Sequence, residues 1–284
     1  MPQLLQAGYV VKALIRSPSK VPSSWAQHPN FELVMGDLKS DLSKWLEGAD
    51  QAIHMAGLIK ARTRKDFMSV NMMGSQAVAK AAQAANLEKL ILISSMAARE
   101  PQLSDYAASK RAGEDAMRAV FEGDLSILRP PAVFGPGDQA TKPIFDVINA
   151  GWLPVTGLGY KKTNISMIYV KDLTACILQE LQKTCKVFNL TAPATVKAMD
   201  WLSFAKMCSQ AIGKPVRLLP IPLFILFPVA AATSVTLRLF GMGHLSLQKL
   251  REFRHPDWTS EDEVDNPTPM IDALRQTAAS YRKN

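Results

Sequence analysis

A phenol and an ammonium lie one helical turn apart in the segment LSDYAASKRAG, which contains Tyr106 and Lys110. Positions i and i+4 of a helix share a face, so the two side chains are expected to be neighbours. An ammonium beside a phenol favours the phenolate and is expected to lower the pKa of the tyrosine. Such a tyrosine can exchange a proton with an alcohol or ketone oxygen near neutral pH. The spacing therefore predicts carbonyl–alcohol chemistry, with an ordinary surface helix as the alternative.

The elements expected to position this pair are alternating strands and helices. Apolar runs predict strands at residues 10–15, 31–35, 51–55, 89–94 and 125–129. Helical spacing occupies residues 42–48, 65–85 and 106–122. This alternation is typical of a parallel sheet covered on both faces, whose ligand site lies at the carboxyl ends of the strands. Ser95 ends the fourth strand, so its hydroxyl is expected to reach the same substrate oxygen as Tyr106.

The pattern loosens after residue 134. A helix is predicted at residues 142–150, and a strand, a helix and a strand follow at residues 165–169, 171–182 and 187–190. We expect residues 1–134 to form a nucleotide-binding core, to which strands from about 165–190 return. Residues 135–284 are expected to form mainly a smaller substrate-binding lobe.

The composition limits the classes of ligand. The formal net charge is +8 with an isoelectric point near 9.4, and the basic residues are spread along the chain. This distribution suits anionic ligands such as dinucleotides or nucleotide-sugars, and it lacks the basic helix face typical of nucleic-acid binding. The three cysteines and four histidines show no metal-ligand spacing, so no metal site is expected.

The N-terminal residues do not have the pattern of a signal peptide, because Gln3, Gln6 and Lys12 interrupt the apolar residues. The uneven number of cysteines fits a reducing compartment. A cytoplasmic protein is therefore expected.

One apolar run, LLPIPLFILFPVAAATSVTL at residues 218–237, approaches the length of a membrane span. Pro220, Pro222 and Pro228 argue against one straight helix. The run is expected to form a buried or substrate-covering helix. Association of residues 218–240 with a membrane surface is the alternative.

Six motifs resemble, in chain order, those of the extended short-chain dehydrogenase/reductase superfamily, also called the NAD-dependent epimerase/dehydratase family. They are IHMAG from Ile53, VNMMGSQAVAKAAQAA from Val70, LILISSMAA from Leu90, YAASK from Tyr106, LRPPAVFGPGD from Leu128 and MIYVKDLTACIL from Met167. The resemblance runs over about residues 1–190. It implies a Rossmann-like, doubly wound parallel α/β sheet with a smaller C-terminal lobe, and an NAD(P)-dependent enzyme.

The resemblance also implies roles for single residues. Tyr106 is the implied general acid/base, Lys110 adjusts Tyr106 and binds the nicotinamide ribose, and Ser95 positions the substrate oxygen. Asp37 matches an aspartate that contacts adenine, with an ordinary turn aspartate as the alternative. The implied cofactor-binding residues are Arg16, Asp37, Leu38, His54, Ala56, Gly57, Asn71, Ser94, Tyr106, Lys110, Pro130 and Val133.

The chain departs from this family at its beginning. The family starts with a strand and a G-x-x-G-x-x-G loop, whose glycines let a pyrophosphate approach a helix N-terminus. Here MPQLLQAGYVVKALIR resembles the end of the next helix and then the second strand, so the first strand and the glycine-rich loop are missing. We expect further residues upstream of Met1. A chain that has lost half of its phosphate cradle is the alternative.

The end of the second strand bears on the choice of cofactor. A carboxylate there would bind a ribose 2′-hydroxyl, but the chain has Arg16. A guanidinium pairs well with phosphate oxygens, so NADP is favoured over NAD, with a surface arginine as the alternative.

The expected reaction is hydride transfer on a carbonyl/alcohol group of a small molecule, with Tyr106 moving the proton. Met96 and Ala97 replace the Asp-Glu pair of the family's 4,6-dehydratases, and the apolar residues 221–239 suit a less polar substrate. A nucleotide-sugar epimerase is the alternative function, and a non-catalytic dinucleotide-binding accessory protein is the second alternative. Helices such as residues 106–122 often pair two subunits in the family, so a homodimer is an open expectation.

Overall fold

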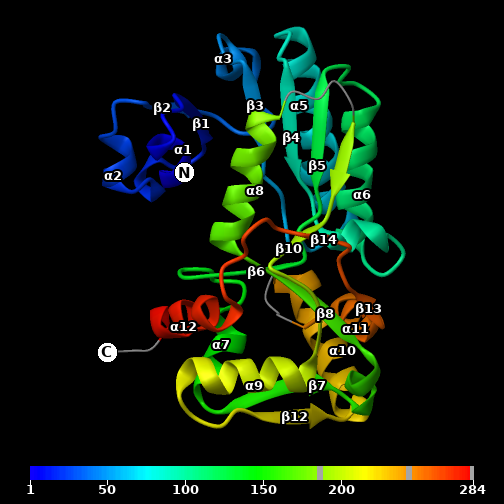
Figure 1. Cartoon of the computed structure of the whole chain (residues 1–284). Helices are drawn as coiled ribbons and strands as arrows, with labels where there is room; N and C mark the ends of the chain where they lie inside the picture. The colour runs from blue at the N-terminus through cyan, green and yellow to red at the C-terminus, as the bar shows by residue number, and fades with distance from the viewer. Residues whose placement is uncertain (184–187, 241–244, 282–284) are drawn as a thin grey trace.

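The computed structural model describes residues 1–183, 188–240 and 245–281, and it has two parts (Figure 1). The part at the top of Figure 1 holds a parallel sheet with the strand order β3-β4-β5-β9. Its strands are β3 (Gln51–His54), β4 (Lys89–Ile93), β5 (Asp124–Leu128) and β9 (Asn189–Thr191). The helices that cover it are α5 (Met73–Ala84), α6 (Asp105–Arg118) and α8 (Val170–Gln182).

The apolar runs form buried strands because the sheet is covered on both faces. Successive side chains of a strand point to opposite faces. Leu90 and Leu92 of β4 pack in one cluster with Met117 of α6, whereas Ile91 packs with Ile177 of α8. The predicted parallel α/β fold is therefore confirmed.

The first two strands stand apart from this sheet. β1 (Val11–Ile15) and β2 (Phe31–Met35) form a parallel pair of their own, drawn in blue in Figure 1. The five strands predicted in the first 130 residues are each present within one residue at either end. The short helices of this part are α1 (Pro2–Gln6), α2 (Ser23–Ala26), α3 (Ser43–Leu46) and α4 (Arg64–Phe67), with 3-10 helices at Pro18–Lys20 and Met96–Arg99.

The single helix predicted at residues 65–85 is divided. α4 ends at Phe67, a π-helical turn covers Met68–Met72, and α5 continues the helix. This turn holds Asn71 in a buried position, and α6 crosses it closely. A Cβ atom on Gly113 would lie 2.6 Å from the backbone oxygen of Asn71. Only glycine therefore allows α6 to pack there without a backbone shift.

The part at the bottom of Figure 1 is the C-terminal lobe. β8 pairs with β6, β11 and β13, β7 pairs with β12, and β10 pairs with β14. Of the strands predicted between residues 165 and 190, β9 joins β5, whereas β8 lies in the lobe. Residue 187, the predicted start of the last strand, lies outside the described residues.

The lobe strands are β6 (Ala132–Phe134), β7 (Trp152–Thr156), β8 (Asn164–Tyr169), β10 (Pro193–Ala194), β11 (Val196–Asp200), β12 (Arg217–Ile221), β13 (Asp257–Trp258) and β14 (Asp262–Glu263). The lobe helices are α7 (Lys142–Asn149), α9 (Trp201–Ile212), α10 (Leu223–Phe240), α11 (Leu247–Arg254) and α12 (Met270–Ser280), with a 3-10 helix at Leu158–Lys162. Its core is a separate apolar cluster that includes Phe134, Phe145, Leu153, Phe204 and Leu274.

The apolar run at residues 218–237 forms most of β12 and of α10, and the expectation of a buried helix is wrong for much of α10. Phe224 is 77% exposed and Val235 is 56% exposed, whereas Ala230 is fully buried. α10 contacts α11 along one narrow side, where the Ser234 hydroxyl accepts a hydrogen bond from the Leu247 amide at 3.0 Å. In the described part of the chain, no helix is both long and apolar enough to cross a membrane.

Candidate active site

Ser95 and Tyr106 meet where β4 ends and α6 begins. Ser95 caps the 3-10 helix that follows β4, its Oγ accepting a hydrogen bond from the Ala97 amide at 3.2 Å. Ser104 caps α6 by accepting one from the Ala107 amide at 3.0 Å, which places Tyr106 in the first turn. The side chains of Ser95 and Tyr106 are hydrogen-bonded to each other. Two hydroxyls can therefore reach one ligand oxygen here.

The expected direction of the Tyr106 pKa shift is wrong. Burial raises the pKa of Tyr106 above its usual value, the hydrogen bond from Ser95 opposes this, and the negative charge of Glu252 raises the pKa further. Desolvation disfavours the phenolate, and this effect outweighs the neighbouring donors. Tyr106 is therefore a protonated phenol at neutral pH.

The Lys110 side chain binds the main chain, and it is not among the groups that shift the pKa of Tyr106. Its Nζ donates a hydrogen bond to the Ile93 carbonyl at 2.9 Å, at the end of β4. The same Nζ lies 3.8 Å from the point where a Cβ atom on Gly57 would stand. Burial lowers the pKa of Lys110 to about 8, and the charge of Glu114 partly opposes the shift. Lys110 thus binds the end of β4 and lies beside Gly57, in the loop that follows β3.

Asn71 holds the loop that follows β3. Its Nδ2 donates to the Leu58 carbonyl at 2.9 Å and to the Ser109 Oγ at 2.9 Å, and its Oδ1 accepts from the Leu58 amide at 2.7 Å. Ala56 and Gly57 are exposed in this loop. The loop backbone is therefore held in place and remains open to a ligand beside Lys110.

His54 lies under that loop and does not face it. The ring is 2% exposed, and its Nε2 is 3.2 Å from the Ser75 Oγ of α5. Burial and then the charge of Lys110 lower the pKa of His54 to about 4. His54 is therefore neutral at pH 7 and supports the end of β3.

Ser94 belongs to a buried ionic network rather than to the open loop. Its hydroxyl donates to the Glu114 carboxylate, which binds Arg129 through Nε at 3.0 Å and Nη2 at 2.5 Å. The carboxylate thus holds the Ser94 hydroxyl inside the protein, and contact of Ser94 with a cofactor stays a prediction. The role of Glu114 was not predicted, although Tyr106, Lys110 and Glu114 repeat every four residues along one helix face.

The remaining predicted cofactor residues lie on other elements. Arg16 is exposed just after β1. Asp37 shapes the turn after β2, where its Oδ1 accepts from the Lys39 amide at 2.8 Å. Leu38 packs closely on Gly74: a Cβ atom on Gly74 would lie only 2.6 Å from the Leu38 Cδ1.

Two further predicted cofactor residues follow β5. The Pro130 carbonyl accepts a hydrogen bond from the Met96 amide at 2.9 Å, and Val133 pairs with Ile168 between β6 and β8. The structure thus brings Ser95, Tyr106 and Lys110 together, while Arg16 and Asp37 lie on the separate β1–β2 pair.

Helix α11 of the C-terminal lobe is docked on the start of α6. The Ser104 hydroxyl donates to the carboxylate of Glu252, which is 5% exposed and pairs with Lys249 at 2.7 Å. The Gln248 Oε1 accepts from the Asp105 amide at 3.0 Å. Nothing in the local sequence pattern indicates that Glu252 lies near Tyr106, so its place in the site was not predicted.

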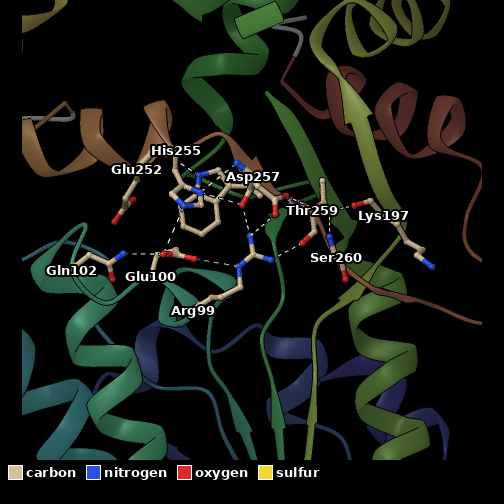
Figure 2. Close-up of polar contacts among 11 residues, drawn as sticks. Arg99, Glu100, Gln102, Lys197, Glu252, His255, Asp257, Thr259 and Ser260 are labelled. Atoms are coloured by element: carbon tan, nitrogen blue, oxygen red, sulfur yellow. Dashed lines mark hydrogen bonds and ion pairs between the residues drawn. The ribbon is translucent and has the colours of Figure 1, made fainter. Parts of the chain in front are cut away.

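The segment after α11 adds a second set of contacts to the same region. In Figure 2, Arg99 and Glu100 face His255, Asp257 and Thr259. The Arg99 guanidinium donates to the Thr259 carbonyl at 2.9 Å, and the His255 Nε2 lies 3.7 Å from the Glu100 carboxylate. The lobe is therefore held against the turn that carries Ser95.

A polar cavity lies beside this contact. Its volume is about 220 Å³, and its polar lining includes Arg99, Arg129, Thr191, Thr259, Glu261 and Asp262. No group of three or more metal-ligating side chains lies together among the residues that the structure describes. The cavity therefore offers side chains of both charges and hydroxyls, and it lies next to the turn after Ser95 rather than at Tyr106 itself.

Three comparisons relate this chain to known proteins. Residues 1–147 match a family model described as NAD(P)H-binding. Ceramide reductase of Caulobacter vibrioides is 36% identical, over 98% of this chain and 89% of its own length. Subunit 9 of the mitochondrial NADH dehydrogenase [ubiquinone] 1 alpha subcomplex of Mus musculus is 24% identical over 80% of this chain, which spans 55% of that subunit. UDP-glucuronic acid 4-epimerase from Bacillus cereus, solved with NAD, has the same fold, with a TM-score of 0.72, 16% identity and coverage of 99% of this chain and 93% of that one.

Proposed function

This chain belongs to the extended short-chain dehydrogenase/reductase superfamily as an NAD(P)-binding enzyme, and from this premise we propose that it reduces the carbonyl group of a ceramide-like lipid with NADPH. The observation that carries the proposal is the hydrogen-bonded pair of Ser95 and Tyr106, in which the raised pKa keeps the phenol protonated. A protonated phenol is the form needed to reduce a ketone rather than to oxidise an alcohol. The name of the 36% identical ceramide reductase supports a lipid substrate.

The chain's own residues perform the proton side of this reaction. The bound cofactor supplies the hydride that forms the new C–H bond at the carbonyl carbon. Ser95 and Tyr106 both donate hydrogen bonds to the carbonyl oxygen, and Tyr106 transfers its proton to that oxygen as negative charge develops. The products are a secondary alcohol and a tyrosinate, which regains a proton from water. Lys110, whose Nζ is bound to the Ile93 carbonyl at the end of β4, holds the first turns of α6 against the strand that carries Ser95.

The two ends of a dinucleotide would meet different elements. The held loop at Gly57 and the Nζ of Lys110 suit the nicotinamide ribose, since Gly57 has no side chain to cover that cation. Arg16, exposed after β1, suits the 2′-phosphate of NADPH. Asp37 lies after the neighbouring strand β2, on the adenosine side.

The function is tested by turnover with two substrate and cofactor pairs. We expect NADPH consumption with the keto form of a ceramide, faster than NADH consumption, and no isomerisation of UDP-glucuronic acid in the presence of NAD. Isomerisation of the nucleotide-sugar would show an epimerase instead. Binding of NADPH without either reaction would show a non-catalytic dinucleotide-binding protein.

Arg16→Ala should reduce the preference for NADPH over NADH about tenfold, because the guanidinium that pairs with the 2′-phosphate is lost. Arg217→Ala on β12 is the control and should leave this preference unchanged.

Glu252→Gln is expected to move the alkaline loss of reductase activity to lower pH. The charge of Glu252 raises the pKa of Tyr106, so its removal lowers that pKa. Reduction needs the protonated phenol, so activity falls as the pH rises through this pKa, and in the variant the fall begins earlier. The measurement is kcat/KM for the keto lipid as a function of pH.

The amide that Glu252→Gln introduces retains an acceptor for the Ser104 hydroxyl, so the capped start of α6 is kept. Glu263→Gln, an exposed change on β14, serves as the matched control and should leave the profile unchanged. A profile of Glu252→Gln that coincides with that control, or that moves to higher pH, would contradict the role of this carboxylate.

A further inference from the structure

Helix α10 carries a group of exposed large apolar side chains. Its members are Phe224 (77% exposed), Ile225 (45%), Phe227 (43%), Val229 (47%) and Val235 (56%), which we call the α10 face. Exposed apolar groups of this size gathered on one element mark an interaction site, whereas single exposed apolar residues do not.

Basic residues border the α10 face. Within residues 223–236 and 245–254, the charged side chains are Lys249, Arg251, Arg254 and Glu252. Glu252 is the one acidic residue of these segments, and it is buried against Ser104. Arg251 and Arg254 are exposed, and the guanidinium of Arg254 lies 5.7 Å from the ring centre of Phe227. Within these segments of α10 and α11, the exposed charge is therefore entirely positive.

A cavity of about 210 Å³ opens between α10 and α11. It is lined by Phe227, Leu247, Leu250, Arg251 and Arg254. Apolar walls with two guanidinium groups match the two parts of a phospholipid, because the walls suit an acyl chain and the guanidinium groups suit a phosphate.

We propose that the α10 face, together with Arg251 and Arg254, binds the surface of a membrane that contains anionic phospholipid. α10 lies along such a surface rather than across it, since its apolar residues suit the interface and no described helix can span a bilayer. The opposite side of α11 carries Gln248 and Glu252 to the start of α6. A membrane bound at α10 is therefore one helix away from Tyr106.

A second copy of the chain fits this surface less well. In a two-fold dimer the same patch meets itself. That contact would bring Arg251 and Arg254 near their own counterparts with no exposed acidic residue of α10 or α11 to pair with them. Anionic headgroups supply the missing negative charge.

The test is flotation of the full chain with vesicles, without cofactor or substrate, so that its outcome is independent of the proposed reaction. The vesicles contain either phosphatidylcholine alone or equal parts of phosphatidylcholine and phosphatidylglycerol. We expect binding to the mixed vesicles that weakens with added salt. Phe224→Glu should lower the partition coefficient at least about tenfold, and Arg251→Gln with Arg254→Gln should lower it roughly 30-fold.

Matched controls lie on or just after α9, away from this surface. Leu202→Glu places the same charge at an apolar residue that is 54% exposed, and Lys206→Gln with Lys214→Gln removes two exposed cations. Both controls should bind like the original chain, and unfolding temperatures should agree among all variants. Equal loss in the controls, or no binding to mixed vesicles, would overturn the proposal. So would a dimer in solution that Phe224→Glu dissociates while no vesicle binding is found.

Discussion

Tyr106→Phe is expected to lower reductase turnover by about 10³-fold while leaving NADPH affinity within about twofold of the original value. The change removes the proposed proton donor and, with it, one of the two hydrogen bonds proposed to the carbonyl oxygen. The ring is retained, and with it the packing on Phe67, whose ring centre is 6.0 Å from that of Tyr106. Turnover is measured with the keto lipid at saturating NADPH, and NADPH affinity by quenching of intrinsic fluorescence.

A matched control separates this loss from a general effect of removing a hydroxyl. Tyr160→Phe alters a partly buried tyrosine of the lobe, whose hydrogen bonds from Thr163 go to its backbone carbonyl. This variant should keep full turnover. Full turnover in Tyr106→Phe would refute the proton role, and loss of NADPH binding together with a lowered unfolding temperature would show a structural role instead.

Glu114→Ala is expected to destabilise the fold by about 3–5 kcal/mol. Glu114 is 2% exposed and binds both Arg129 and Ser94, so its loss leaves a nearly buried guanidinium without its carboxylate. The free energy of unfolding is obtained from urea titration followed by circular dichroism.

The next residue of the same helix provides the control. Asp115 also pairs with an arginine, but its contact with Arg111 is 3.4 Å long and both side chains are exposed. Asp115→Ala should therefore cost less than about 1 kcal/mol. Similar losses in the two variants would show that the buried pair contributes no more than a surface pair.

Glu114 also affects the site through Lys110. Its charge raises the pKa of Lys110, which burial lowers to about 8. Loss of Glu114 therefore lowers this pKa and reduces the cationic fraction of Lys110 at neutral pH. The carboxylate thus links the stability of α6 to the charge beside Tyr106.

Local sequence pattern was sufficient for the elements around the site. The apolar run that became β4 is short and continuous, as burial on both faces requires. Helical spacing predicted a helix from residue 106, one residue after the observed start of α6, and so placed Tyr106 in its first turn. The π-helical turn before α5 was not predictable, since it depends on the crossing of α6 at Gly113.

The ends of β1 and β3 illustrate a different limit. The side chains after them were expected to serve one cofactor, but whether β1 and β3 share a sheet is decided by strand pairing, and here they do not. The neighbouring side chains of Ser94 and Ser95 point to opposite sides of the strand end, because successive residues of an extended chain alternate in direction. Ser94 meets Glu114, and Ser95 meets Tyr106.

The sequence by itself determined the parallel α/β fold, the family and the spacing of Tyr106 and Lys110, because these depend on local periodicity and on motifs contiguous in the chain. Only the tertiary structure decided the direction of the Tyr106 pKa shift and the exposure of α10. Both depend on what distant segments remove from water. Docking of α11 brings Glu252 toward Tyr106 and buries one side of α10, and no local pattern encodes that contact.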